Sequence, residues 1–202
     1  MTRMLWAVLV SGSVLGLSGS TFAQSNNFLR FVSEPGGSTC SLNYSEPGVV
    51  MIHVILDGTA PSSAVQFSAV TPECWTGATW LCDRVDLPFL SLGNTQDPVN
   101  GISVAVNGCK EMPVYIGTIH HQVTDLSASC CAYAPGPAEV QTPAGPLNIL
   151  ATVDCTIPYF MEWVIRPVEP VGITVNAGAS CPCELALSTS ETTWGRVKAL
   201  YR

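Results

Sequence analysis

Cysteine is the residue whose number and spacing carry the most chemistry in this chain. There are nine cysteines, and the two densest groups are Cys130-Cys131 and Cys181-Pro182-Cys183. In an oxidising compartment such a set predicts a disulfide framework, although spacing alone does not give the connectivity. The candidates for disulfide bonds are Cys40, Cys74, Cys109, Cys130, Cys131, Cys155, Cys181 and Cys183. Because nine is odd, one thiol must stay free, pair between molecules or lie buried.

The cysteine positions also suggest which parts of the chain are held together. We expect Cys40 and Cys74 to clamp the N-terminal half, and the five cysteines from Cys130 onward to staple the C-terminal half. A Cys-x-Cys pair can instead exchange disulfides or bind a soft metal. The framework interpretation is favoured over a redox role because no Cys-x-x-Cys in a βαβ context is present.

Three histidines are the other candidates for metal binding. His120 and His121 are adjacent, so on a strand their rings point to opposite faces and only one of them can join His53. A copper or zinc site built from His53, His120 and the thiolates of Cys181-Pro182-Cys183 is therefore one hypothesis. A histidine in a strand is more often a hydrogen-bonded structural residue. We accordingly assign no metal and no cofactor.

Known catalytic motifs are absent from the sequence. It contains no Gly-x-Ser-x-Gly, no His-Glu-x-x-His and no glycine-rich phosphate cradle. Catalytic partners can meet in space without meeting in sequence, so a secreted hydrolase with a loop-built site near His120 and His121 remains an alternative. No catalytic residue is assigned, and a non-catalytic module is the favoured interpretation.

The N-terminus indicates where these residues work. Arg3 precedes a mainly apolar run from Leu5 to Leu17, which is too short to cross a bilayer, and small residues follow up to Ala23. This layout predicts a signal peptide over residues 1–23 and export to the periplasm, the cell surface or the medium. No later segment has the length of apolar sequence that a membrane helix needs, so we expect no transmembrane anchor after cleavage.

Charge limits the class of partner. Without Arg3, seven basic residues stand against fifteen acidic ones, a net charge of −8. An acidic surface repels phosphates and anionic lipids, which argues against binding to nucleic acid. The remaining length suits one domain with a real core, and a hydrophobic fraction of 47% excludes disorder as the main state.

Strand patterns dominate the elements that must position these residues. The β-branched run Val49–Leu56 predicts a central strand that is buried on both faces. Further strands are expected at residues 28–32, 65–69, 79–85, 102–107, 114–123, 148–153, 160–165 and 172–175. Turn residues separate them, and the Pro/Gly-rich stretch 134–146 reads as an exposed loop. Trp75, Trp80 and Trp163 are expected in the core. The predicted fold is an antiparallel, immunoglobulin-like β-sandwich over residues 24–187, with a closed β-barrel as the alternative.

The C-terminal residues 188–202 differ from the rest in composition. A polar linker leads into a basic segment in which Trp194, Val197, Leu200 and Tyr201 fall on one face of a predicted short amphipathic helix. Such a helix could dock on its own domain or serve as a recognition tag for a sorting or envelope component.

Several segments together resemble a group of uncharacterised exported proteins of uncultured bacteria. The segments are Gly37–Cys40, the strand around Val54, Ala64–Ala69, Thr76–Trp80, Ala179–Cys183 and Trp194–Arg202. The resemblance implies that the cysteines are framework and that the Trp-Gly-x-x-Lys-x-x-Tyr-Arg segment is a shared terminal element. It also makes Cys82 the candidate free thiol, since the group has another residue there. No activity comes with it. We therefore expect a secreted binding, adhesion or envelope-structure module for a protein or glycan ligand.

Overall fold

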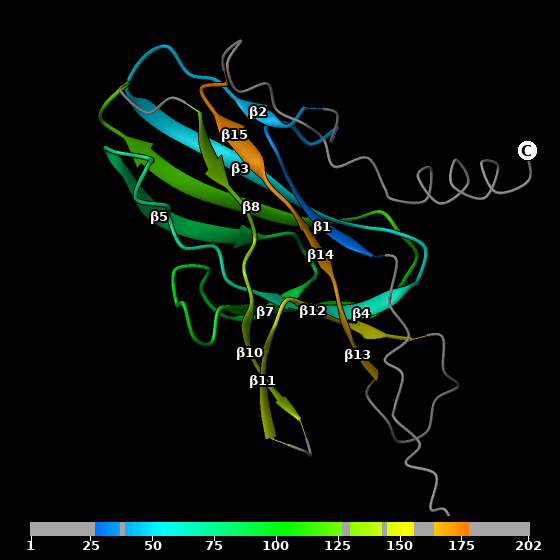
Figure 1. Ribbon diagram of the computed structural model, residues 1–202. Coiled ribbons are helices and arrows are strands. Elements are labelled where there is room, and N and C mark those ends of the chain that lie inside the picture. Colours follow the sequence, from blue (N-terminus) through cyan, green and yellow to red (C-terminus); the bar gives the residue numbers. More distant parts are fainter. Residues whose placement is uncertain (1–26, 37–38, 127–129, 143–144, 156–163, 178–202) are drawn as a thin grey trace, which may run out of the picture.

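The computed structural model describes residues 27–36, 39–126, 130–142, 145–155 and 164–177. Within these residues the regular elements are β-strands, arranged in two large open sheets and two small ones (Figure 1). None of the helices that a bilayer crossing would need is found in the described part of the chain. The expected signal peptide, the polar linker, the C-terminal helix and Trp163 all lie outside the described residues.

The two large sheets form the layers of a sandwich. Sheet 1 has the order β14 (Glu169–Val171), β1 (Phe28–Val32), β3 (Gly48–Asp57), β8 (Val114–Val123) and β5 (Ala78–Val85). Sheet 2 has the order β13 (Val164–Pro167), β12 (Ala151–Asp154), β4 (Ser62–Phe67), β7 (Ile102–Lys110) and β6 (Leu90–Gly93). Both sheets end in edge strands, which confirms the sandwich over the closed alternative.

Two smaller groups of strands flank this sandwich. β2 (Ser41–Leu42), β15 (Ile173–Val175) and β9 (Cys131–Tyr133) form a three-stranded sheet. β10 (Ala138–Thr142) and β11 (Gly145–Ile149) form a hairpin with antiparallel register. The hairpin extends from the body of the molecule below the labels of β7 and β12 in Figure 1.

The core lies between the facing sides of the two large sheets. Alternate residues of β4 and β7 point inward from sheet 2, and they meet inward residues of β1, β3 and β8 from sheet 1. The buried set includes Leu29, Phe31, Ile52, Val54, Leu56, Val65, Phe67, Ile102, Val104, Val106, Ile116 and Ile119. Phe31 and Phe67 join the layers through an edge-on ring contact with centroids 6.3 Å apart. Apolar burial at about 25 cal/mol per Å² is the main force that holds the layers together.

The structure corrects the purely antiparallel prediction. β1 pairs with β14 in parallel, and β2 pairs with β15 in parallel. In each case the partners come from opposite ends of the domain, so no hairpin fixes their relative direction. The other pairings within sheets 1 and 2 are antiparallel.

Two expected elements also change. The stretch 134–146 is not a loop, because the β10–β11 hairpin begins within it and its prolines flank Ala138–Thr142 instead of interrupting that strand. The single strand expected at 148–153 is divided at Leu150, whose carbonyl accepts a hydrogen bond from the Val168 amide. The central strand β3 is buried on both faces only from Ile52, since Val49 and Met51 are exposed.

The disulfides tie the two halves of the chain together. Cys74 bonds to Cys131, and Cys109 bonds to Cys155. The expectation that each half is clamped separately is therefore wrong, because a sandwich places strands that are distant in sequence side by side. Cys40 and Cys130 are also disulfide-bonded, and Cys82 is a free thiol. Cys181 and Cys183 lie outside the described residues.

Candidate functional site: a groove on the outer face of sheet 2

A row of apolar side chains crosses the whole outer face of sheet 2. Directly opposite residues on antiparallel strands present their side chains on the same face. The register aligns one residue from each of the five strands in the row Ile165, Val153, Ala64, Ala105 and Leu90. The next row along holds Ala151, Gln66, Ser103 and Leu92. The solvent side of this sheet is thus more apolar than the alternation rule for a half-exposed sheet predicts.

The β10–β11 hairpin turns this face into a groove. Glu139, Val140 and Gln141 of β10 stand beside the sheet and enclose a volume of about 840 Å³ with it. The Gln66 amide holds the hairpin in place, donating to the carbonyl oxygens of Asn100 (3.0 Å) and Glu139 (2.9 Å). The Glu139 amide also donates to the Val99 carbonyl at 2.6 Å. The groove is therefore built on paired backbone.

The polar groups of the groove are amides, a hydroxyl and a carboxylate. The Gln141 side-chain amide donates to Glu139 Oε1 at 2.6 Å. No aromatic ring, histidine, lysine or arginine is among the described residues that line the groove. The groove can therefore take up aliphatic groups and hydrogen-bond a polar backbone, while its described residues offer no nucleophile with a base beside it.

One side of the groove ends at an edge strand with exposed leucines. β6 is the last strand of sheet 2, and Leu90 and Leu92 are 75% and 80% exposed. Exposed leucines on an unpaired edge are a site at which a protein normally pairs or aggregates. Their place beside a groove makes an interaction site the natural explanation.

The histidine pair does not form a site. His121 is fully buried, with its ring 4.7 Å from the ring of Trp75 and its Nε2 2.9 Å from Thr71 Oγ1. His120 points to the outer face of sheet 1, which is the face that also carries His53. The two histidines therefore serve opposite sides of the same sheet, as their adjacency predicted.

The remaining candidates are equally dispersed. His53 hydrogen-bonds Tyr115 Oη at 2.7 Å through Nδ1, and burial with the nearby charge of His120 lowers its pKa. Burial also lowers the pKa of His120, and Arg84 adds to that effect. Among the described residues, no three histidine, cysteine, aspartate or glutamate side chains are placed to hold a metal ion. Trp75 is in the core as expected, and Trp80 packs against its edge.

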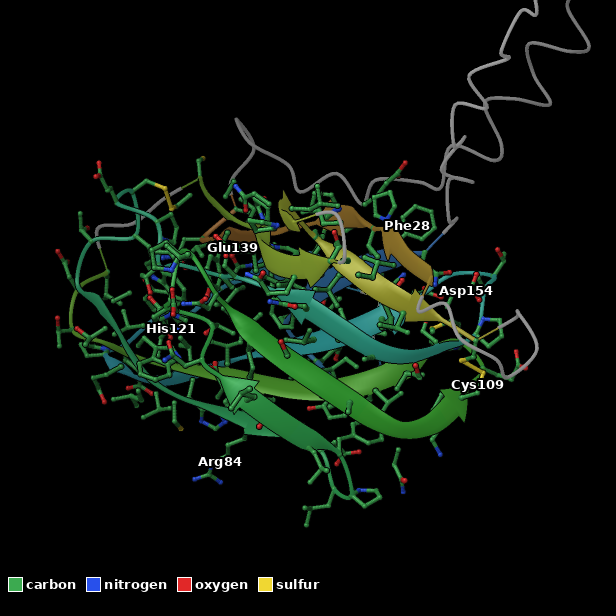
Figure 2. All side chains as sticks on the ribbon, turned by 90° about the horizontal axis from the view of Figure 1, so that it is seen from below. Phe28, Arg84, Cys109, His121, Glu139 and Asp154 are labelled. Carbon is green, nitrogen blue, oxygen red and sulfur yellow. A yellow bond between two sulfur atoms is a disulfide. The ribbon has the colours of Figure 1, made fainter. Side chains whose placement is uncertain are left out.

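Figure 2 shows how these positions are separated. Glu139 lies on the side of the groove, whereas Arg84 points away from the opposite side of the sandwich. His121 lies between these two sides. Sequence analysis missed the groove because it treated the 134–146 stretch as a loop. The alternation Ala138-Glu139-Val140-Gln141-Thr142 was the signal that could have revealed the hairpin.

Comparison with known proteins gives a distant likeness. No family model and no curated protein matches the chain. Among solved structures, the chain is similar to the seventh ScaB type I cohesin of Pseudobacteroides cellulosolvens, with 14% identity, a TM-score of 0.45 and coverage of 80% of this chain and 97% of that chain. It is also similar to the sixth scaffoldin B cohesin of Acetivibrio cellulolyticus, solved with a Cel5 dockerin mutant, at 11% identity and a TM-score of 0.41 over 75% of this chain and 99% of that one. A cohesin from a Clostridium thermocellum cohesin–dockerin complex aligns at 7% identity and a TM-score of 0.38, covering 74% and 98%.

Proposed function

We propose that the chain is an exported, non-catalytic module whose groove binds an aliphatic segment of a protein partner. The observation that carries the proposal is the apolar row across sheet 2, which continues from the groove to the exposed edge strand β6. Burial of one leucine-sized side chain there would contribute about 1.5–3 kcal/mol to binding.

The chemistry of the lining favours a peptide segment over a glycan. Sugar-binding surfaces commonly offer aromatic rings on which a pyranose stacks, and the described residues of the groove have none. Aliphatic pockets with a few amides are suited to protein side chains and their backbone. Gln66 and Gln141 can exchange their present hydrogen bonds for bonds to a bound backbone.

Charge defines the partner further. The described residues include twelve acidic and four basic side chains, and Glu139 stands at the wall of the groove. A segment with basic residues beside its aliphatic ones would be attracted to this surface and would associate faster at low salt. We therefore commit to an aliphatic, basic segment of another protein as the occupant.

Site-specific photocrosslinking in the native host tests this proposal. A benzoylphenylalanine at Ser103 samples the groove floor, and the same group at Thr79 on the exposed outer side of sheet 1 is the matched control. We expect position 103, and not position 79, to crosslink to one protein whose attached peptide mass spectrometry identifies as aliphatic and basic. Crosslinks from position 103 only to residues 188–202 of the chain itself, or only to glycan, would overturn the proposal.

A pair of leucine substitutions supplies the quantitative test. Leu92→Asp places a charge at the groove, whereas Leu87→Asp changes a leucine that is 86% exposed and lies outside it. With the identified partner segment as titrant, Leu92→Asp should weaken binding at least tenfold in calorimetry, and Leu87→Asp should leave it unchanged. Both variants should unfold at the wild-type temperature. Equal binding by Leu92→Asp and wild type would contradict the assignment of the groove.

A further inference from the structure

The outer face of sheet 1 carries a second cluster, independent of the groove. β5, β8 and β3 lie side by side in Figure 1, and their register places Cys82 opposite His120 and His120 opposite Met51. Directly opposite residues on one face have Cβ atoms about 4.5–5.5 Å apart. A thiol, an imidazole and a thioether therefore stand in one row across three strands.

The orientation of this row is settled by its neighbours. His121, next to His120, is buried in the core, so His120 faces outward. The register between β5 and β8 shifts between Trp80 and Cys82, so that Leu81 is the extra residue and Cys82 joins the outward row. Met51 is 47% exposed. All three side chains can be reached from solvent.

The state of Cys82 makes the row chemically notable. The other cysteines of the described part of the chain are disulfide-bonded, and Cys82 is free. A partly exposed free thiol is an oxidation hazard in the exported compartment that the N-terminus predicts. An ion held by that sulfur would protect it and would give the thiol a use.

His120 already has the arrangement of a metal ligand. Thr118 Oγ1 lies 2.8 Å from His120 Nε2. With the proton on Nε2 donated to Thr118, the Nδ1 atom keeps its lone pair for a metal ion. Metal-binding histidines commonly fix their orientation through such a hydrogen bond on the second nitrogen.

The ligand types select the metal. Zinc sites use four ligands from cysteine, histidine, aspartate and glutamate, and no group of even three such residues gathers among the described residues. Cuprous ion accepts fewer ligands and prefers soft thiolate and thioether sulfur with imidazole. Arg84 stands in the next row, opposite Thr118, and a thiolate bound to a monovalent cation is neutral and is not repelled by it.

We propose that Cys82, His120 and Met51 form a binding site for Cu(I) on the outer face of sheet 1. Binding replaces the thiol proton by the metal: the S–H bond breaks, the S–Cu bond forms, one proton leaves to solvent, and copper stays in the cuprous state. The site takes shape by side-chain rotation on a fixed sheet. It uses other residues than the Cys181-Pro182-Cys183 hypothesis, and it stands whether or not the groove binds a protein.

Anaerobic competition against the cuprous chelator bathocuproine disulfonate tests the site in the intact exported chain. We expect one Cu(I) per chain, release of one proton per copper, and a copper–sulfur together with a copper–nitrogen shell in X-ray absorption. Cys82→Ser should lower the Cu(I) affinity at least 100-fold. His120→Gln and Met51→Leu should each lower it at least tenfold. These residues are wholly or partly exposed, so unfolding curves should stay close to wild type.

Two controls separate this site from its rivals. Met112→Leu changes a methionine that packs against the core and should leave Cu(I) affinity unaltered. The double variant Cys181→Ser/Cys183→Ser should also keep wild-type affinity and proton release. The proposal fails if the chelator removes all copper from the wild type, if Cys82→Ser binds as well as wild type, or if the double variant loses the metal instead.

Discussion

At the scale of single residues, His121 is the most constrained titratable group of the described domain. Its ring packs against Trp75 and meets the ring of Tyr133 edge-on, with centroids 5.5 Å apart. Thr71 has one hydroxyl proton and donates it to Gln96 Oε1 at 3.0 Å, so its oxygen accepts from His121 Nε2–H. His121 is thereby assigned as neutral, with a buried Nδ1 that has no hydrogen-bond partner.

This environment predicts a pH dependence of stability. Burial, with a smaller contribution from the charge of His120, lowers the pKa of His121 to about 4, against 6.5 for an unperturbed histidine. Between these two values the unfolded chain binds the proton and the folded chain does not, so the free energy of unfolding rises with pH. Lowering the pH from 7 to 4 should cost about 3 kcal/mol through this residue. Urea unfolding of wild type and His121→Asn over this range measures the difference.

His120 supplies the control for that titration. His120→Gln changes a partly exposed ring, so it should keep nearly all of the wild-type loss of stability at low pH. The ring of His121 can also be followed directly by nuclear magnetic resonance in the wild type. A titration midpoint above 6, or a proton on Nδ1 at neutral pH, would contradict the assignment.

At the scale of elements, β8 depends on one glycine. Gly117 has φ +150°, and the register of β8 shifts there against β3. A Cβ at this position would run into the Arg84 carbonyl oxygen of β5. The close approach of three strands in sheet 1 therefore requires a residue without a side chain.

Gly117→Ala should accordingly destabilise the domain by about 2–4 kcal/mol, since it adds both a backbone clash and an unfavourable φ. Gly48→Ala is the matched control, because Gly48 begins β3 and has nothing within 4 Å of an added Cβ. That variant should change the free energy of unfolding by less than about 0.5 kcal/mol. Chemical denaturation of the two variants side by side decides the matter, and equal losses would refute the role given to Gly117.

The elements also show what the sequence could and could not reveal. Long β-branched or alternating runs predicted β1, β3, β5, β7 and β8 almost to their ends, because burial of an apolar face outweighs other local preferences. Short strands such as β2 and β6 carry too few residues to show a period. β6 in particular exposes all four of its residues, so its sequence lacks the alternation of a half-buried strand.

The groove needed information that no local pattern holds. Its apolar row takes one residue from each of five strands, and only the register of sheet 2 brings Ile165 in line with Leu90. In the same way Cys82, His120 and Met51 are 31 to 69 positions apart in sequence and become neighbours through strand pairing alone. Sites of this kind follow from tertiary pairing, whereas the number of cysteines could be read directly.

At the scale of the whole molecule, two disulfides hold the sandwich at opposite ends. Cys131 is buried, and Cys74 precedes Trp75, which contacts His121. Cys109 lies at the other end of the sandwich from His121 in Figure 2 and bonds to Cys155. Each bond joins segments that different strands carry, so both oppose the separation of the chain into its N-terminal and C-terminal halves.

Removal of either bond should therefore cost a large part of the stability. The sequence separations are 57 and 46 residues, and loop-closure entropy for loops of that size gives about 4 kcal/mol for each bond. Cys109→Ser/Cys155→Ser should lose about this amount, and Cys74→Ala/Cys131→Ala about 1 kcal/mol more, because it also removes buried sulfur packed in the core. Cys82→Ser breaks no bond and should cost less than about 0.5 kcal/mol. With a total stability of about 5–15 kcal/mol for a domain, loss of both bonds should leave the chain largely unfolded in urea titrations at 25 °C. A wild-type midpoint in either double variant would mean that sheet pairing alone holds the two halves together.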